Sequence, residues 1–138
     1  MTGASGHFHL PVRVYDEDTD AGGEVFYANY LAFMERARTE WLRSLGYDNS
    51  GLAEAHGVVF AVRRAELDFL KPARLDDALV VTAQVTEIRR ASLAFEQQVL
   101  RDEETLCRGT VKLVCVDTER FRPTAIPAAL LDRMGNGR

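Results

Sequence analysis

The sequence is poor in cysteine, and its 138 residues contain only Cys107 and Cys115. The two lie in one strand-like segment, where an extended chain separates them by roughly 26 Å, far beyond the reach of a disulfide. We therefore expect two free core thiols in a protein of a reducing compartment, the cytoplasm.

Basic charge and long apolar runs are lacking too. The net charge is −4 at pH 7, so the chain has no basic footprint for nucleic acid. No apolar run reaches the ~18–20 residues that span a bilayer, and the first residues show no signal peptide. What is present, 46% hydrophobic and 28% charged residues, is typical of one globular domain. We expect it to span residues 1–138, with about 1–9 and 128–138 as flexible or peripheral tails.

The order of hydrophobic periods predicts an α+β fold. Apolar residues recur with helical spacing from about residue 28 to 45 and cover nearly half of the helix circumference. Arg38 projects into that apolar arc and needs a partner. A short strand precedes the helix, and period-two patterns between residues 58 and 117 predict four long strands. Because one sheet face must bury itself on the helix, we expect a five-stranded antiparallel sheet wrapped around one long central helix. Its uncovered outer face and edges predict an oligomer joined through the sheet.

Four carboxylates crowd into the segment before the helix, at Asp16, Glu17, Asp18 and Asp20. Calcium binding does not fit, because an EF-hand loop starting at Asp16 has Ala21 and Tyr27 where the loop needs Gly and a bidentate Glu. One interpretation is turn and cap chemistry. The other is an acyl-transfer site, in which a carboxylate lies beside the polarised N–H groups of a helix start. Gly22 and Gly23, which follow Asp20, permit a close backbone approach to a substrate.

The motif D-T-D-x-x-G…Y-x-x-Y in "VRVYDEDTDAGGEVFYANYLAFMERARTEWL" is followed at a characteristic distance by "PARLDD". With "VKLVCVD", these segments resemble the 4-hydroxybenzoyl-CoA thioesterase-like hotdog family over about 110 residues. Within that family, they are closest to the acyl-CoA thioesterases associated with the Tol–Pal system. The resemblance implies the hotdog fold, which is the architecture that the element order also predicts.

The resemblance also implies roles for single residues. The second Asp of the D-x-D motif, Asp20, corresponds to the catalytic carboxylate, and Tyr27 to the residue whose backbone N–H binds the thioester carbonyl. The Tol–Pal-associated branch commonly has His at this position, whereas Tyr is similar to the 4-hydroxybenzoyl-CoA enzyme. Asp18 is interpreted as structural. The expected substrate-binding residues are Gly22, Gly23, Phe26, Tyr30, Arg89 and Arg90.

The arginine pair lies at a turn between two predicted strands, where it resembles the family's phosphate-contacting region. The alternative for Arg89 and Arg90 is a solvated hairpin turn. The predicted function is hydrolysis of a short-chain, medium-chain or aromatic acyl-CoA, with Asp20 as nucleophile or general base. The sequence predicts no metal and no cofactor, since coenzyme A is part of the substrate.

The family implies a homotetramer built as a dimer of dimers, and a possible association with Tol–Pal or with acyl carrier protein. The alternative function is a non-catalytic hotdog module that binds acyl-CoA or a protein partner.

Overall fold

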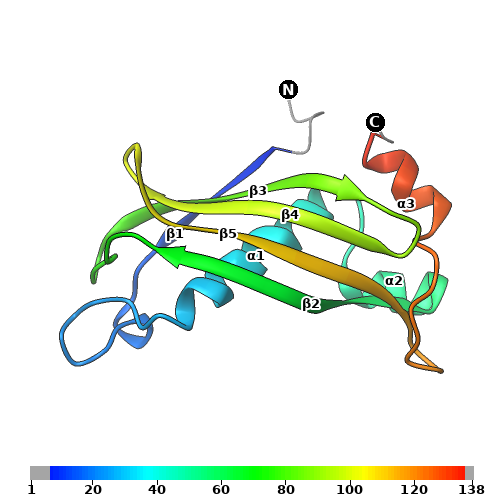
Figure 1. The fold of residues 1–138 in the computed structure, drawn as a ribbon, viewed down its shortest axis with the longest axis horizontal. Helices are drawn as coiled ribbons and strands as arrows, with labels where there is room; N and C mark the ends of the chain where they lie inside the picture. The colour runs from blue at the N-terminus through cyan, green and yellow to red at the C-terminus, as the bar shows by residue number, and fades with distance from the viewer. Residues whose placement is uncertain (1–6, 136–138) are drawn as a thin grey trace.

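Five antiparallel strands and one long helix dominate the computed structural model of the protein, which describes residues 7–135 (Figure 1). The strands pair in the order β1-β3-β4-β5-β2, which leaves β1 and β2 at the edges. This confirms the predicted α+β fold. In chain order the elements are β1 (Phe8–Arg13), η1 (Asp16–Asp18), α1 (Asn29–Ser44), α2 (Asn49–His56), β2 (Val58–Phe69), β3 (Ala78–Ile88), β4 (Ser92–Arg101), β5 (Glu104–Asp117) and α3 (Ala128–Arg133).

The long helix α1 crosses one face of the sheet, as Figure 1 shows, and matches the predicted helix to within a residue at each end. It packs against β1, β3 and β4. Its buried residues are those that the helical period selects, and Trp41 among them meets Phe95 of β4 edge to face with ring centroids 5.1 Å apart. Burial of this apolar arc is the main force that holds the helix on the sheet.

Arg38 finds the partner that its position requires. Its Nη1 donates a hydrogen bond of 2.9 Å to Oε1 of Gln97, a buried residue of β4. The Nε2 of Gln97 donates in turn to the carbonyls of Met34 and Thr82, both at 3.0 Å. A single amide thus links the helix to two strands and satisfies a cation at the margin of the core.

The edge strand β2 is left largely uncovered. Pairing with β5 places Phe60, Val62, Ala65, Leu67 and Phe69 on the side of the sheet that faces α1. Because α1 covers the other half of the sheet, the side chain of Val62 is still 55% exposed and that of Phe69 52% exposed. Within residues 7–135, the strand therefore presents both an edge that no other strand pairs with and an apolar stripe.

Regular elements of the fold extend into both of the expected tails. Residues 8–9 belong to β1, which pairs with β3, and residues 128–133 form α3, whose Leu130 is completely buried. The remaining residues of the two expected tails lie mostly outside the described part of the chain. Cys107 and Cys115 are buried and free. Within residues 7–135, no helix is long and apolar enough to cross a membrane.

Candidate active site

Asp20 lies in a short hairpin between η1 and α1. The N–H of Asp20 donates to the Glu24 carbonyl at 2.8 Å, and the Gly23 N–H donates to the Asp20 carbonyl at 3.0 Å. The Asp20 side chain is exposed, and its Oδ1 accepts from the N–H groups of Gly22 at 2.9 Å and Glu24 at 3.2 Å. Within residues 7–135, Oδ2 has no hydrogen-bond donor. The hairpin therefore orients the carboxylate by one oxygen and presents the other.

The two glycines shape this hairpin. Gly23 has a φ of 80°, a left-handed conformation that side chains other than glycine adopt at a cost. Its carbonyl accepts from the N–H of Leu75 at 3.1 Å, which fixes the hairpin to the loop between β2 and β3. In the same loop, the Ala73 carbonyl accepts a hydrogen bond of 2.9 Å from the Val25 N–H. The Gly22 N–H thus binds the Asp20 carboxylate and the Gly23 carbonyl binds the loop before β3.

The backbone N–H of Tyr27 lies two residues ahead of the first helical residue, Asn29. The N–H groups of Asn29, Tyr30 and Leu31 already donate to carbonyls three residues back. At the start of this helix, the N–H groups without an acceptor in residues 7–135 are instead those of Tyr27 and Ala28. The unpaired donors therefore belong to the approach to the helix, and the N–H that the resemblance selects is one of them.

Aromatic side chains form a wall beside this N–H. The Tyr27 ring, which is 64% exposed, lies 4.8 Å from the Phe26 ring and 6.2 Å from the Phe69 ring, measured between centroids. Tyr30 is buried, 5.5 Å from Phe69, and its hydroxyl oxygen accepts from the Ala73 N–H at 3.0 Å. Burial raises the pKa of the Tyr30 phenol, and this hydrogen bond only partly offsets the effect.

Phe69 was missed by the sequence analysis. It is the last residue of β2 and directly precedes the loop that contains the "PARLDD" motif. Its place in the strand period marks it as an inward-facing residue, but only the position of α1 shows that half of it stays exposed in the described part of the chain. The wall thus has four members, Phe26, Tyr27, Tyr30 and Phe69.

Arg89 and Arg90 lie at the other end of the sheet from Asp20. The Asp20 hairpin joins the loop before β3, whereas the arginines follow the end of β3, at the right of Figure 1. Ten steps of extended strand separate the two ends by roughly 33 Å. The guanidinium of Arg89 pairs with Glu87 at 2.6 Å, and both arginines are exposed. Within one chain, the structure does not bring these arginines to the carboxylate.

A second loop joins the arginine end. The Ile126 N–H donates to the Arg90 carbonyl at 2.9 Å, which fixes the segment after β5 against the β3–β4 turn. This segment carries Arg120 and Arg122, both exposed, on either side of Phe121, which is 78% exposed. The sequence analysis missed these arginines, because only the fold places them beside the turn.

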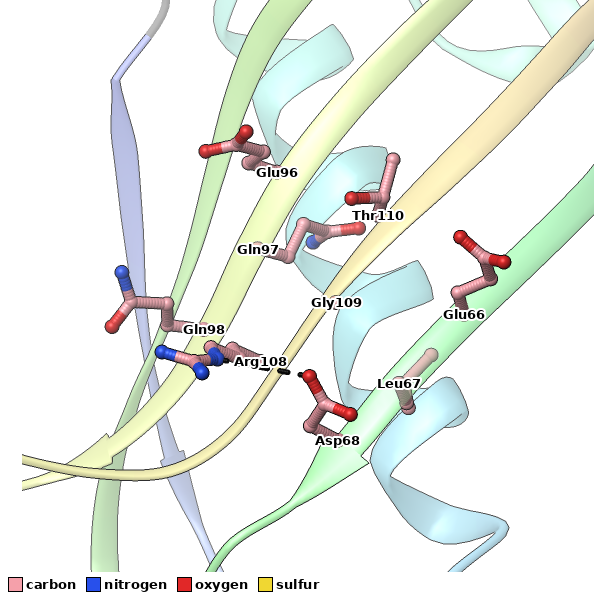
Figure 2. Close-up of a pocket in the computed structure, with 9 residues that line it drawn as sticks. All are labelled: Glu66, Leu67, Asp68, Glu96, Gln97, Gln98, Arg108, Gly109 and Thr110. Atoms are coloured by element: carbon pink, nitrogen blue, oxygen red, sulfur yellow. Dashed lines mark ion pairs between the residues drawn. The ribbon is translucent and has the colours of Figure 1, made fainter.

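A hollow of about 530 Å³ lies elsewhere, on the outer face of the sheet over β2, β4 and β5 (Figure 2). Its nine lining residues are mostly polar, and Arg108 pairs with Asp68 there at 3.8 Å. None of the predicted site residues lines it. In residues 7–135, no three His, Cys, Asp or Glu side chains gather in a way that could hold a metal ion.

The profile of the thioesterase-like superfamily matches residues 14–134. The chain belongs to the thioesterase-like superfamily. Among its relatives in this superfamily is the acyl-CoA thioesterase YbgC of Haemophilus influenzae. The two are 46% identical over 120 residues, which is 87% of this chain and 88% of the relative.

Solved structures of thioesterases from this superfamily have the same fold. A probable thioesterase from Bartonella henselae is 34% identical, with a TM-score of 0.83 over 88% of this chain and 99% of its own. A thioesterase from Thermus thermophilus, solved with coenzyme A and Zn, is 31% identical, with a TM-score of 0.78 over 92% and 96% of the two chains.

Membership of the thioesterase-like superfamily confirms the predicted family, the hotdog fold and the class of enzyme. The protein is a thioester hydrolase. The roles predicted for Asp20, Tyr27 and the substrate-binding residues stay predictions, which the geometry described above makes specific.

Proposed function

We propose that the protein hydrolyses a short-chain, medium-chain or aromatic acyl-CoA to the free acid and CoA, with Asp20 as the catalytic carboxylate. The observation that carries this proposal is the hairpin between η1 and α1. It presents a carboxylate oxygen and, in the described part of the chain, a backbone N–H without an acceptor, next to an exposed aromatic wall. Acyl transfer needs these groups: a base or nucleophile, a donor for the carbonyl, and an apolar surface for the acyl group.

In the proposed reaction the Tyr27 N–H donates to the thioester carbonyl and stabilises the negative charge that develops on its oxygen. Asp20 either attacks the acyl carbon or takes a proton from a water that attacks it. In both routes the C–S bond breaks, and CoA leaves as a thiolate that is then protonated. If Asp20 attacks, the acyl group is held as an anhydride on its carboxylate, and a water then hydrolyses this anhydride and frees Asp20. Either route consumes one water. Since a thiolate is an adequate leaving group, the reaction requires no cofactor besides the CoA of the substrate.

The decisive experiment replaces Asp20→Asn. The new side chain keeps an oxygen for the N–H groups of Gly22 and Glu24 but loses the negative charge. We expect kcat on a panel of acyl-CoA substrates to fall at least ~10²-fold while affinity for CoA is retained. Asp16→Asn is the matched control, because Asp16 is an exposed carboxylate of the same segment. Near-normal turnover by the Asp20 variant would exclude it as the catalytic group. A wild-type protein that binds CoA but hydrolyses no substrate would favour the binding module instead.

The uncovered edge supports a dimer formed through β2. Pairing with a second β2 would satisfy the backbone groups on the free edge of this strand and cover Val62 and Phe69. Native proteins rarely leave such an apolar edge strand exposed. An isologous two-fold axis turns the partner end for end. The β3–β4 turn of the partner then moves toward the end of the sheet that carries Asp20.

Such a dimer also accounts for the distant arginines. The pantetheine arm of CoA has about the bond count of five extended residues, so it reaches roughly 17 Å from thioester to phosphates. That is half of the roughly 33 Å between the Asp20 end and the arginine end of one chain. We therefore assign the phosphates to Arg89 and Arg90 of the partner subunit, with Arg120 and Arg122 of the same cationic end as further candidates.

The cellular location, the tetramer and the protein partners also remain predictions. A cytoplasmic location is supported by the two buried free thiols. A tetramer built from two dimers, and association with the Tol–Pal system or acyl carrier protein, are implied by the family resemblance.

A further inference from the structure

The base of the Asp20 hairpin is closed by the side chain of Asp18. Only 3% of Asp18 is exposed, and no other carboxylate residue in the described part of the chain is buried to this degree. Its Oδ1 accepts from Nδ2 of Asn29 at 2.9 Å, and its Oδ2 accepts from the Tyr15 N–H at 2.9 Å. The Asp18 backbone carbonyl accepts from the Phe26 N–H at 3.0 Å.

These bonds enclose residues 19–28, which include both reacting groups of the proposed mechanism. Asp20 lies on the first arm of the hairpin and Tyr27 follows the second. Asn29 is the first residue of α1, so its bond to Asp18 fixes the start of the helix relative to the first arm. A change in this bond alters the separation of the Asp20 carboxylate from the Tyr27 N–H.

The bond is retained at an electrostatic cost. Asp18 is buried next to Asp16, Glu17 and Asp20, which are exposed and of like charge. Burial of a carboxylate costs free energy unless hydrogen bonds compensate for it. No cation in residues 7–135 forms a salt bridge with Asp18, so compensation comes from the Asn29 amide and the Tyr15 N–H. A turn alone does not require such a carboxylate, whereas a fixed distance between two arms does.

We propose that Asp18 and Asn29 are a positioning pair that holds the Asp20 carboxylate and the Tyr27 N–H in the separation that catalysis requires. The inference rests on the proposed roles of Asp20 and Tyr27. In the proposed mechanism, neither member of the pair is assigned a contact with the substrate. Displacements of about 1 Å in an active site reduce rates by up to ~10²-fold, so loss of the pair should affect turnover before binding.

Exchange of the two side chains provides the test. In Asp18→Asn alone, the new amide N–H group faces another donor, either the Asn29 side-chain amide or the Tyr15 N–H, so one hydrogen bond is lost. Asn29→Asp alone places two carboxylates about a hydrogen-bond length apart. In the double variant Asp18→Asn/Asn29→Asp, the amide at position 18 donates to the carboxylate at position 29, and its oxygen still accepts from Tyr15. Glu17→Gln is the matched control, because it removes an exposed carboxylate of the same 3₁₀ turn.

We expect each single variant to lower kcat about 10-fold or more with KM for acyl-CoA nearly unchanged, and the exchanged variant to recover most of the loss. Glu17→Gln should behave as wild type. Single variants that lower only the melting temperature and keep wild-type kcat would overturn the inference, as would an exchanged variant that folds but stays as slow as the single ones. If neither single variant folds, turnover by the exchanged variant decides. The Asp20→Asn result is separate. Near-normal turnover by that variant refutes the catalytic role of Asp20. If that variant is inactive and the exchange of Asp18 and Asn29 does not restore activity, only the positioning pair is refuted.

Discussion

Replacement of Gln97 by Leu should destabilise the protein strongly, although it leaves no cavity. Leucine has a similar volume, so the core stays filled. The substitution removes three hydrogen bonds at once, from Arg38 to Oε1 and from Nε2 to the carbonyls of Met34 and Thr82. It therefore isolates the polar contribution of the link between α1 and the sheet.

The magnitude follows from what each partner loses. The Met34 carbonyl loses little, because it lies inside α1 and can accept a helical bond from four residues on. The Thr82 carbonyl loses a side-chain donor, at about 1–3 kcal/mol. Arg38 loses its acceptor, and because the guanidinium is only half-buried we take the lower end of the 1.5–3 kcal/mol range for bonds to charged groups. The sum is roughly 2.5–4.5 kcal/mol, a large part of the 5–15 kcal/mol that stabilises a typical domain.

Urea unfolding at one fixed protein concentration measures this change, with Trp41 as the reporter. It is the only tryptophan and is buried against Phe95, so its emission follows the opening of the core. Arg38→Met is the companion variant. Burial lowers the pKa of Arg38, which means that its charge is desolvated, so its removal should cost less than the loss of Gln97.

The double variant completes the cycle. Once Arg38 is Met, Gln97→Leu no longer leaves a cation without an acceptor, and its cost should fall by about 1–2 kcal/mol. A Gln97→Leu protein destabilised by less than about 1 kcal/mol, or two substitutions whose costs simply add, would refute this account of the network.

Light scattering should give a multiple of the 15.4 kDa chain mass, and Val62→Glu should shift the protein toward monomer. A wild-type monomer at micromolar concentration would contradict the β2 dimer. Replacement of Arg89 and Arg90 by Ala should raise KM for acyl-CoA about 10-fold or more per residue with kcat unchanged, and an equal rise for acyl-pantetheine would point to folding. Mixed with Asp20→Asn chains, this double variant should regain activity at low substrate if the arginines act across the dimer. Burial raises the pKa of Cys107 to about 12 and of Cys115 to about 11. A thiol reagent at pH 8 should therefore label neither cysteine until the protein unfolds. Rapid labelling of the native protein would contradict their burial.

Sequence patterns predicted the elements of the fold because the two hydrophobic periods are strong in this chain. The helical period selects the residues of α1 that are buried, and the alternation in β3 and β5 selects Leu79, Val81, Val111 and Cys115, all of them in the core. They also showed that Arg38 needs a partner. They did not identify Gln97 as that partner, because a contact between residues 59 positions apart depends on how the helix lies on the sheet.

The parts of the site that sequence reasoning missed have the same cause. Phe69 reads as an ordinary inward residue of a strand, and its exposure depends on α1 covering only part of the sheet. Arg89 and Arg90 were grouped with Asp20 as one site, although a single chain holds them at opposite ends. A list of residue types cannot distinguish a site within one chain from a site shared by two, because that depends on distances of tens of ångströms.

Tyrosine at position 27 is compatible with the proposed chemistry because the donor there belongs to the backbone. The Tyr27 side chain points to Phe26 and Phe69 and forms part of the aromatic wall, while its N–H lacks an acceptor in the described part of the chain. A different side chain at this position therefore changes the surface that meets the acyl group and leaves the carbonyl donor in place. The four neighbouring carboxylates also differ in their surroundings, although their residue types are alike. Asp16 and Glu17 remain in solvent, Asp18 is buried and bonded to Asn29, and Asp20 is presented by the hairpin. Residue type makes a carboxylate available, and the backbone bonds around it decide which one can meet a substrate.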